Sequence, residues 1–153
     1  MSEAGKIRGG GSALFTGTPN QSWACPGKGA PSHAYINLGA DSKARSQIEK
    51  AVYFFSEAVR LDPNVAAAHY NLGVVFLSQG KNQEAALHFS EALRMNPNDE
   101  IAHNDLGVVY YRLGRLPEAV RKFETAVEIN PQFSEAQKNL EEMRRILTGR
   151  NRQ

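Results

Sequence analysis

The sequence predicts an all-α fold, a solenoid built from antiparallel pairs of helices. Columns of identical residues recur at a spacing of 34, a period typical of stacked structural repeats. Within each period, apolar residues follow one another at steps of three and four, as on one face of a helix. A proline closes each period, where a helix cannot continue. The columns are Leu38, Leu72, Leu106 and Leu140; Gly39, Gly73 and Gly107; Ala51, Ala85 and Ala119; Phe55, Phe89 and Phe123; Ala58, Ala92 and Ala126; Pro63, Pro97 and Pro131.

Residues 1–31 lie outside this pattern. They hold 7 of the 13 glycines and 3 of the 7 prolines, and their apolar residues follow no helical or strand period. Such a composition is typical of flexible chain, so we predict a disordered leader. An alternative is that Trp23, the single tryptophan, anchors this segment to a partner.

The first repeat, residues 32–65, is the most irregular. Ser42 stands where the later repeats have an aromatic residue, and Ser46 stands where they have glycine. Its first helix therefore has a thinner apolar stripe and lacks the glycine that ends a helix in the left-handed conformation. We expect this helix to be frayed.

The second and third repeats, residues 66–99 and 100–133, each predict two helices. In the second repeat a helix over 66–79 ends at Gly80, and a second helix over about 83–96 ends before Pro97. Small residues recur where two helix backbones come close, and aromatic residues recur around them. The two stripes are His69, Leu72, Gly73 and Phe76, then Ala85, Phe89, Ala92 and Leu93.

Residues 134–148 predict a single capping helix. Ala136, Leu140, Met143 and Leu147 share one face, while charged residues occupy the rest. Such a helix covers the core of the third repeat and presents a polar surface to solvent. Residues 149–153 are left as a tail.

This pattern resembles the tetratricopeptide repeat, whose signature is Trp, Leu-Gly, Tyr, Ala, Phe and Pro. The second repeat has His69-x-x-Leu72-Gly73-x-x-Phe76, and the third has His103-x-x-Leu106-Gly107-x-x-Tyr110. The resemblance covers about residues 32–148. It implies a right-handed α-solenoid, a superhelix of three repeats and a cap, that serves as a scaffold rather than an enzyme.

By this resemblance, one further column faces the groove of the superhelix. An asparagine side chain both donates and accepts, so a row of them is suited to holding the backbone of an extended peptide. The resemblance extends to the asparagine ladder in the repeat region of O-linked N-acetylglucosamine transferases. The alternative is that these side chains are only solvated. The column is Asn37, Asn71, Asp105 and Asn139.

Neighbouring groove positions are expected to set selectivity. They combine two tyrosines, several aliphatic residues and one arginine, which suits an apolar or aromatic ligand side chain better than a highly charged tail. They are Ala67, Tyr70, Val74, Ser78, Ile101, Asn104, Val108, Tyr111 and Arg112.

Some co-chaperones of this family hold the carboxylate at the end of a peptide with lysine, asparagine and arginine. Their central asparagine matches Asn71. The matching basic positions here are Ile36, Ile101 and Asp105, none of which is basic. Because a carboxylate would be repelled by Asp105, we reject that kind of tail binding.

The sequence predicts no catalytic site and no metal or other cofactor. His69 and His103 occupy equivalent positions roughly ~10 Å apart, too far to share a zinc ion with bonds of ~2 Å. His33 and His88 are isolated in the pattern, and we expect them to be exposed or internally hydrogen-bonded. Cys25 has no histidine held beside it.

We therefore expect a scaffold that binds an extended segment or helix of another protein. The net charge of +2 argues against a nucleic-acid partner, and the short apolar runs argue against membrane insertion. The cytoplasm is the expected compartment, and the periplasm is an alternative. Two other functions remain open: a detached repeat region or accessory of a glycosyltransferase-like protein, or a weakly self-associating module.

Overall fold

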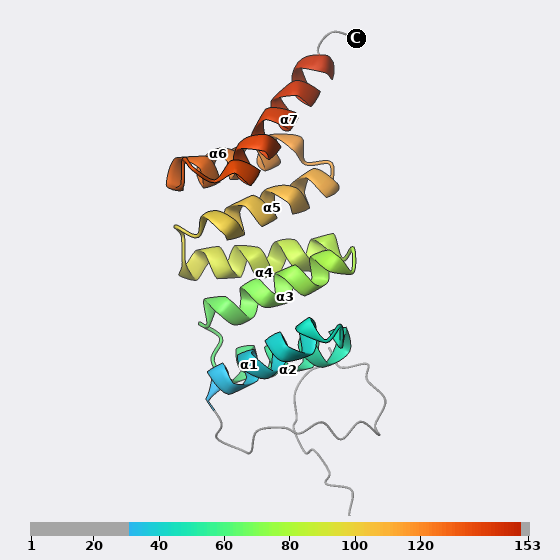
Figure 1. Ribbon diagram of the computed structural model, residues 1–153, viewed down its shortest axis with the longest axis vertical. Helices are drawn as coiled ribbons and strands as arrows, with labels where there is room; N and C mark the ends of the chain where they lie inside the picture. Colours follow the sequence, from blue (N-terminus) through green and yellow to red (C-terminus); the bar gives the residue numbers. More distant parts are fainter. Residues whose placement is uncertain (1–30, 151–153) are drawn as a thin grey trace, which may run out of the picture.

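The computed structural model describes residues 31–150, which form seven helices and no strands (Figure 1). Residues 1–30, with Trp23 and Cys25, lie outside the described residues, as do residues 151–153. The helices are α1 (Ser32–Ala44), α2 (Ile48–Leu61), α3 (Ala66–Ser78), α4 (Asn82–Met95), α5 (Glu100–Arg112), α6 (Leu116–Ile129) and α7 (Ser134–Arg150).

The helices form a continuous stack of hairpins. Each of α1, α3 and α5 packs on the helix that follows it. Helices α2 and α4 pack on the first helix of the next repeat, and α6 packs on α7. The first helices also contact one another, α1 with α3 and α3 with α5. Figure 1 shows the pairs succeeding one another along the long axis, with α7 extending beyond the last pair. The predicted all-α solenoid is confirmed.

The recurring glycine and phenylalanine columns meet in the core. A Cβ atom at Gly73 would lie 2.8 Å from the ring of Phe89, and one at Gly107 would lie 2.6 Å from that of Phe123. Both rings are almost completely buried. Any larger residue would push the ring away, so glycine lets the two helices of a repeat pack around a phenylalanine.

The first repeat is more regular than expected. Helix α1 has 13 residues, as α3 and α5 do, so the prediction of a frayed helix is wrong. Ser46 adopts φ 58°, close to the 72° of Gly80 and the 75° of Gly114. The hydrogen bond from the Gln47 amide to the Ser42 carbonyl, 2.8 Å long, closes the helix in this conformation. Serine thus stands in the left-handed conformation that usually favours glycine, within the hydrogen-bonded end of the helix.

Ser42 compensates for the missing aromatic residue. Its side chain is 6% exposed, and its hydroxyl donates a 2.7 Å hydrogen bond to the carbonyl of Leu38, one turn earlier. This bond satisfies the polar atom, so the thinner stripe of α1 is buried without an unpaired group.

Helix α7 covers the end of the stack, as predicted. Ala136, Leu140 and Met143 are buried, whereas Glu141 and Arg144 are exposed. The helix continues to Arg150, two residues beyond the predicted end. Within the described residues, no helix combines the length and apolar character that a bilayer span requires.

Candidate functional site

The first helices of the three repeats and α7 present one shared surface, here called the first-helix face. Two large apolar side chains stand out on it: Ile101 is 49% exposed and Tyr111 is 46% exposed. Val74 on α3 and Val108 on α5, also predicted to line the groove, are half-buried. Exposed apolar side chains of this size on one face are typical of a contact surface for another molecule.

The asparagine column lies on this face, but its side chains are largely occupied. Asn71 accepts a 3.2 Å hydrogen bond from Lys43 on α1 and donates a 2.9 Å bond to the carbonyl of Ala67. Asn37 is exposed. Because Asn71 already joins two repeats, it has less capacity to hold a peptide backbone than the sequence pattern indicated.

Asp105, the third member of the column, is joined to the second repeat by Tyr70. The Tyr70 hydroxyl donates a 2.9 Å hydrogen bond to Oδ2 of Asp105. Burial raises the pKa of Asp105 above its ordinary value, although the hydrogen bonds from Tyr70 and Asn104 oppose this. Burial and the Asp105 carboxylate also raise the pKa of the Tyr70 phenol. The Tyr70 phenol therefore keeps its proton at neutral pH and donates it to the hydrogen bond with Asp105.

Asn104 differs from the expectation that it contacts a ligand. Its side chain is 1% exposed, because α7 covers it. Its amide nitrogen lies 3.4 Å from Oε1 of Glu135 and 3.5 Å from Oδ1 of Asp105. Its oxygen accepts a 2.9 Å hydrogen bond from Asn139. Asn104 therefore supports the first-helix face from below and holds two carboxylates beside each other.

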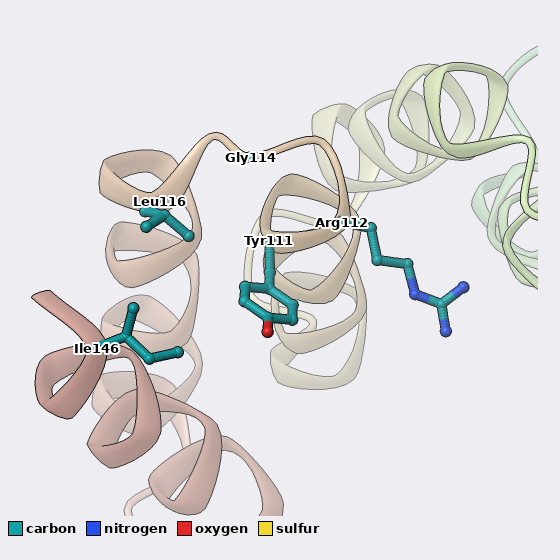
Figure 2. Close-up of a pocket in the computed structure, with 5 residues that line it drawn as sticks. All are labelled: Tyr111, Arg112, Gly114, Leu116 and Ile146. Atoms are coloured by element: carbon teal, nitrogen blue, oxygen red, sulfur yellow. The ribbon is translucent and has the colours of Figure 1, made fainter. Parts of the chain in front are cut away.

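A pocket of about 400 Å³ opens where α5, α6 and α7 meet, and we call it the cap pocket (Figure 2). Its walls are Tyr111, Arg112, Gly114, Leu116 and Ile146. In Figure 2 the side chains of Tyr111, Leu116 and Ile146 surround a common space, while that of Arg112 points away from it. Tyr111 and Arg112 were predicted to line the groove, whereas the pocket walls formed by Leu116 of α6 and Ile146 of α7 were not predicted.

Arg112 extends toward the second repeat instead. Its guanidinium donates a 3.2 Å hydrogen bond to the carbonyl of Leu77, near the end of α3. The side chain is exposed. Arg112 thus bridges two first helices at one edge of the first-helix face.

His88 is not isolated. Its Nδ1 lies 3.2 Å from Nδ1 of His69, and its ring stacks on Phe76 with centroids 5.4 Å apart. The Nε2 of His69 lies 3.1 Å from the carbonyl of Pro63. If His69 donates from Nε2 to that carbonyl, its Nδ1 accepts a hydrogen bond from Nδ1–H of His88. Burial and the nearby His69 lower the pKa of His88 to about 4.

This pair has equivalents in the other repeats. Tyr35 and Phe54 occupy the same two positions in the first repeat, and their rings lie 6.3 Å apart. His103 and Lys122 occupy them in the third. Within residues 31–150, no group of three or more His, Cys, Asp or Glu side chains is arranged to hold a metal ion. The histidine pair therefore fits a packing role between the helices of the second repeat.

Comparisons with known proteins agree with this architecture. A family model described as tetratricopeptide repeat matches residues 43–100 and 76–134. The sequence matches no curated protein.

Several solved structures are similar to the chain. The Arabidopsis OM64 TPR domain is 25% identical, with 74% of this chain and 94% of that one covered and a TM-score of 0.72. The Sgt2 TPR domain from Aspergillus fumigatus is 21% identical, with 84% and 89% covered and a TM-score of 0.74. The first TPR of Spaghetti (RPAP3), bound to the HSP90 peptide SRMEEVD, is 19% identical, with 76% and 93% covered and a TM-score of 0.74.

Proposed function

The chain belongs to the tetratricopeptide repeat family, and from this premise we propose that it is a scaffold that binds a segment of another protein on its first-helix face. The observation that carries the proposal is the exposure of two large apolar side chains on α5, Ile101 at 49% and Tyr111 at 46%. Domains of the same fold hold peptides, as the complex of Spaghetti with SRMEEVD illustrates. The same fold carries many functions, so the residues of this face decide the ligand.

The face supports an extended ligand better than a compact one. Val74 on α3 and Val108 on α5 are half-buried, and Ile101 and Tyr111 on α5 are exposed, so apolar side chains are spread over two repeats. In such an arrangement, each repeat contributes a few side chains to a ligand that crosses it. The asparagine column lies on the same surface. Its side chains can bind a ligand only through donors or acceptors that are not already used in hydrogen bonds within the chain.

An acidic peptide tail is a poor ligand for this face. A chain end that carries carboxylates, like the SRMEEVD peptide of the Spaghetti complex, requires basic side chains on the receptor. In this chain, Ile101 and Asp105 on α5 occupy the positions where a receptor for such a tail is expected to have basic residues. The hydrogen bond from Tyr70 holds the Asp105 side chain in place. Because its charge has the same sign as that of an acidic tail, we expect Asp105 to repel such a tail.

Head-to-tail self-association is the second candidate. Leu38 in α1, at one end of the described stack, is only half-buried, whereas the equivalent Leu72 and Leu106 are 2% and 1% exposed. The outer surface of α7, however, presents exposed Glu141 and Arg144. An apolar end would then meet a charged one, which disfavours this contact. Concentration-dependent mass in light scattering would support self-association.

The test is a pull-down from host lysate with the full chain as bait, read by mass spectrometry. Val108→Glu places a charge on the first-helix face, and Leu87→Glu places the same charge on α4, where Leu87 is 61% exposed. Both variants are first checked for equal helicity by circular dichroism. The proposal expects a partner that is retained by the unmodified chain and by Leu87→Glu but lost with Val108→Glu. Retention by all three baits would move the site away from this face.

A further inference from the structure

The first-helix face differs in charge from one end of α5 to the other. Ile101, Asp105, Val108 and Arg112 follow one another at steps of four, three and four, so they form one stripe on α5. Asp105 lies near one end of this stripe beside Glu135 of α7, because both carboxylates share the buried amide of Asn104. The cap pocket lies at the other end, beside Tyr111.

Among residues 31–150, the carboxylates at the first end form no ion pair with a basic side chain. The groups that act on Asp105 are the Tyr70 phenol from α3, the Asn104 amide, and the carboxylates of Glu135 and Asp99. Asp99 accepts a hydrogen bond from the Ala102 amide at the start of α5 and adds no positive charge. Within residues 31–150, the ion pairs of the structure do not include Asp105 or Glu135. A cation placed here would relieve the repulsion between like charges.

The cap pocket at the second end suits an apolar group. Tyr111, Leu116 and Ile146 surround it (Figure 2), and its volume of about 400 Å³ is ample for one large side chain. Asp105 and Tyr111 are six residues apart on α5, which is about 9 Å along the helix axis. An extended chain covers that distance in about three residues. The two ends can therefore be reached by one short segment.

Resting on the proposed function, we infer that this face selects a partner segment with a lysine or arginine about three residues from a bulky apolar side chain. The basic group lies between Asp105 and Glu135, and the apolar group enters the cap pocket. Ile101, which is 49% exposed next to Asp105, packs against the methylene stem of the basic side chain. The partner is thus a basic and apolar peptide segment rather than an acidic one.

A phage-displayed library of random dodecapeptides, selected on the full chain, tests the inference. We expect enriched peptides to share a basic residue and an aromatic or large aliphatic residue at the stated separation. An enriched set dominated by Asp and Glu would overturn the inference while leaving groove binding intact. A library from which nothing is enriched would overturn the proposed function as well.

Charge exchange then locates the contact, with a synthetic enriched peptide followed by fluorescence polarisation. Glu135→Lys reverses the charge at an exposed position, removes the 3.4 Å contact with the Asn104 amide, and is expected to weaken binding by about tenfold. Glu128→Lys makes the same charge change at an exposed position on α6 and should have little effect. A peptide with its basic residue changed to Glu should recover affinity for Glu135→Lys only. Equal losses in both variants, or no recovery, would contradict the assignment of the basic subsite.

The cap pocket is tested separately with the same peptide. Ile146→Ala removes part of the pocket wall and should weaken binding of the peptide with its bulky apolar residue by about tenfold. The same variant should bind a peptide with alanine at that position as weakly as the unmodified chain does. If Ile146→Ala leaves the affinity for the bulky peptide unchanged, the pocket is not the apolar subsite.

Discussion

Tyr70 on α3 donates its hydroxyl to Asp105 on α5 across 2.9 Å, and this bond joins the second and third repeats on the first-helix face. The two residues are 35 apart in the sequence, one more than the repeat period. The bond therefore connects adjacent columns of neighbouring repeats. It fixes the carboxylate that we assign to a basic ligand group.

Removal of this hydroxyl is expected to destabilise the chain. Tyr70→Phe leaves the half-buried Asp105 without its phenol donor and should lower the free energy of unfolding by about 1–2 kcal/mol. Urea denaturation followed by circular dichroism measures the change. Tyr111→Phe is the matched control, because Tyr111 is 46% exposed, and it should change stability by less than about 0.5 kcal/mol. Equal effects of the two variants would show that the bond is not a stabilising one.

The close approach of α5 and α6 gives a second prediction. Gly107→Ala places a Cβ 2.6 Å from the Phe123 ring and should cost about 1–3 kcal/mol of stability. Phe123→Leu removes the ring, so the double variant should be less destabilised than the sum of the two single changes. Gly149→Ala meets nothing within 4 Å and should not destabilise. Strict additivity in the double variant would rule out a direct clash.

The histidine pair of the second repeat predicts a loss of stability in acid. The pKa of His88 falls from 6.5 to about 4 on folding, so the unfolded chain takes up the proton first. The stabilisation is complete above pH 6.5 and is lost progressively as the pH falls to about 4. Urea denaturation at a series of pH values measures this loss.

His88→Phe, which copies Phe54 of the first repeat, should make stability less dependent on pH over this range. The control is His33→Gln, since His33 is exposed at the start of α1, and it should keep the dependence of the unmodified chain. If His88→Phe retains the full dependence, the histidine pair does not cause it.

The sequence predicted the parts of the fold that repeat. Gly73 and Phe89 recur in register with Gly39 and Phe55, and each pair meets in the core because the packing of one repeat is copied in the next. Exceptions to the period were harder to predict. Ser46 adopts a left-handed conformation at the hydrogen-bonded end of α1, which no local preference of serine indicates.

The candidate site was only partly predictable for the same reason. The column that contains Asn71 and Asp105 was visible, but its hydrogen bonds depend on residues that differ between repeats, such as Lys43 and Tyr70. The burial of Asn104 depends on Glu135 and Asn139 of α7, and the repeat period alone does not show which side chains meet there. A comparison of positions 19 residues apart within each repeat would have indicated the His69–His88 contact, because Tyr35 and Phe54 share that spacing.

Once a partner has been captured, site-directed photo-crosslinking tests directly whether it binds on the first-helix face. Benzoylphenylalanine is placed at Tyr111 on the first-helix face in one sample and at Leu87 on α4 in another; these side chains are 46% and 61% exposed. We expect a covalent adduct with the partner from position 111 and none from position 87. An adduct from position 87 alone would place the partner on the second helices and contradict binding on the first-helix face.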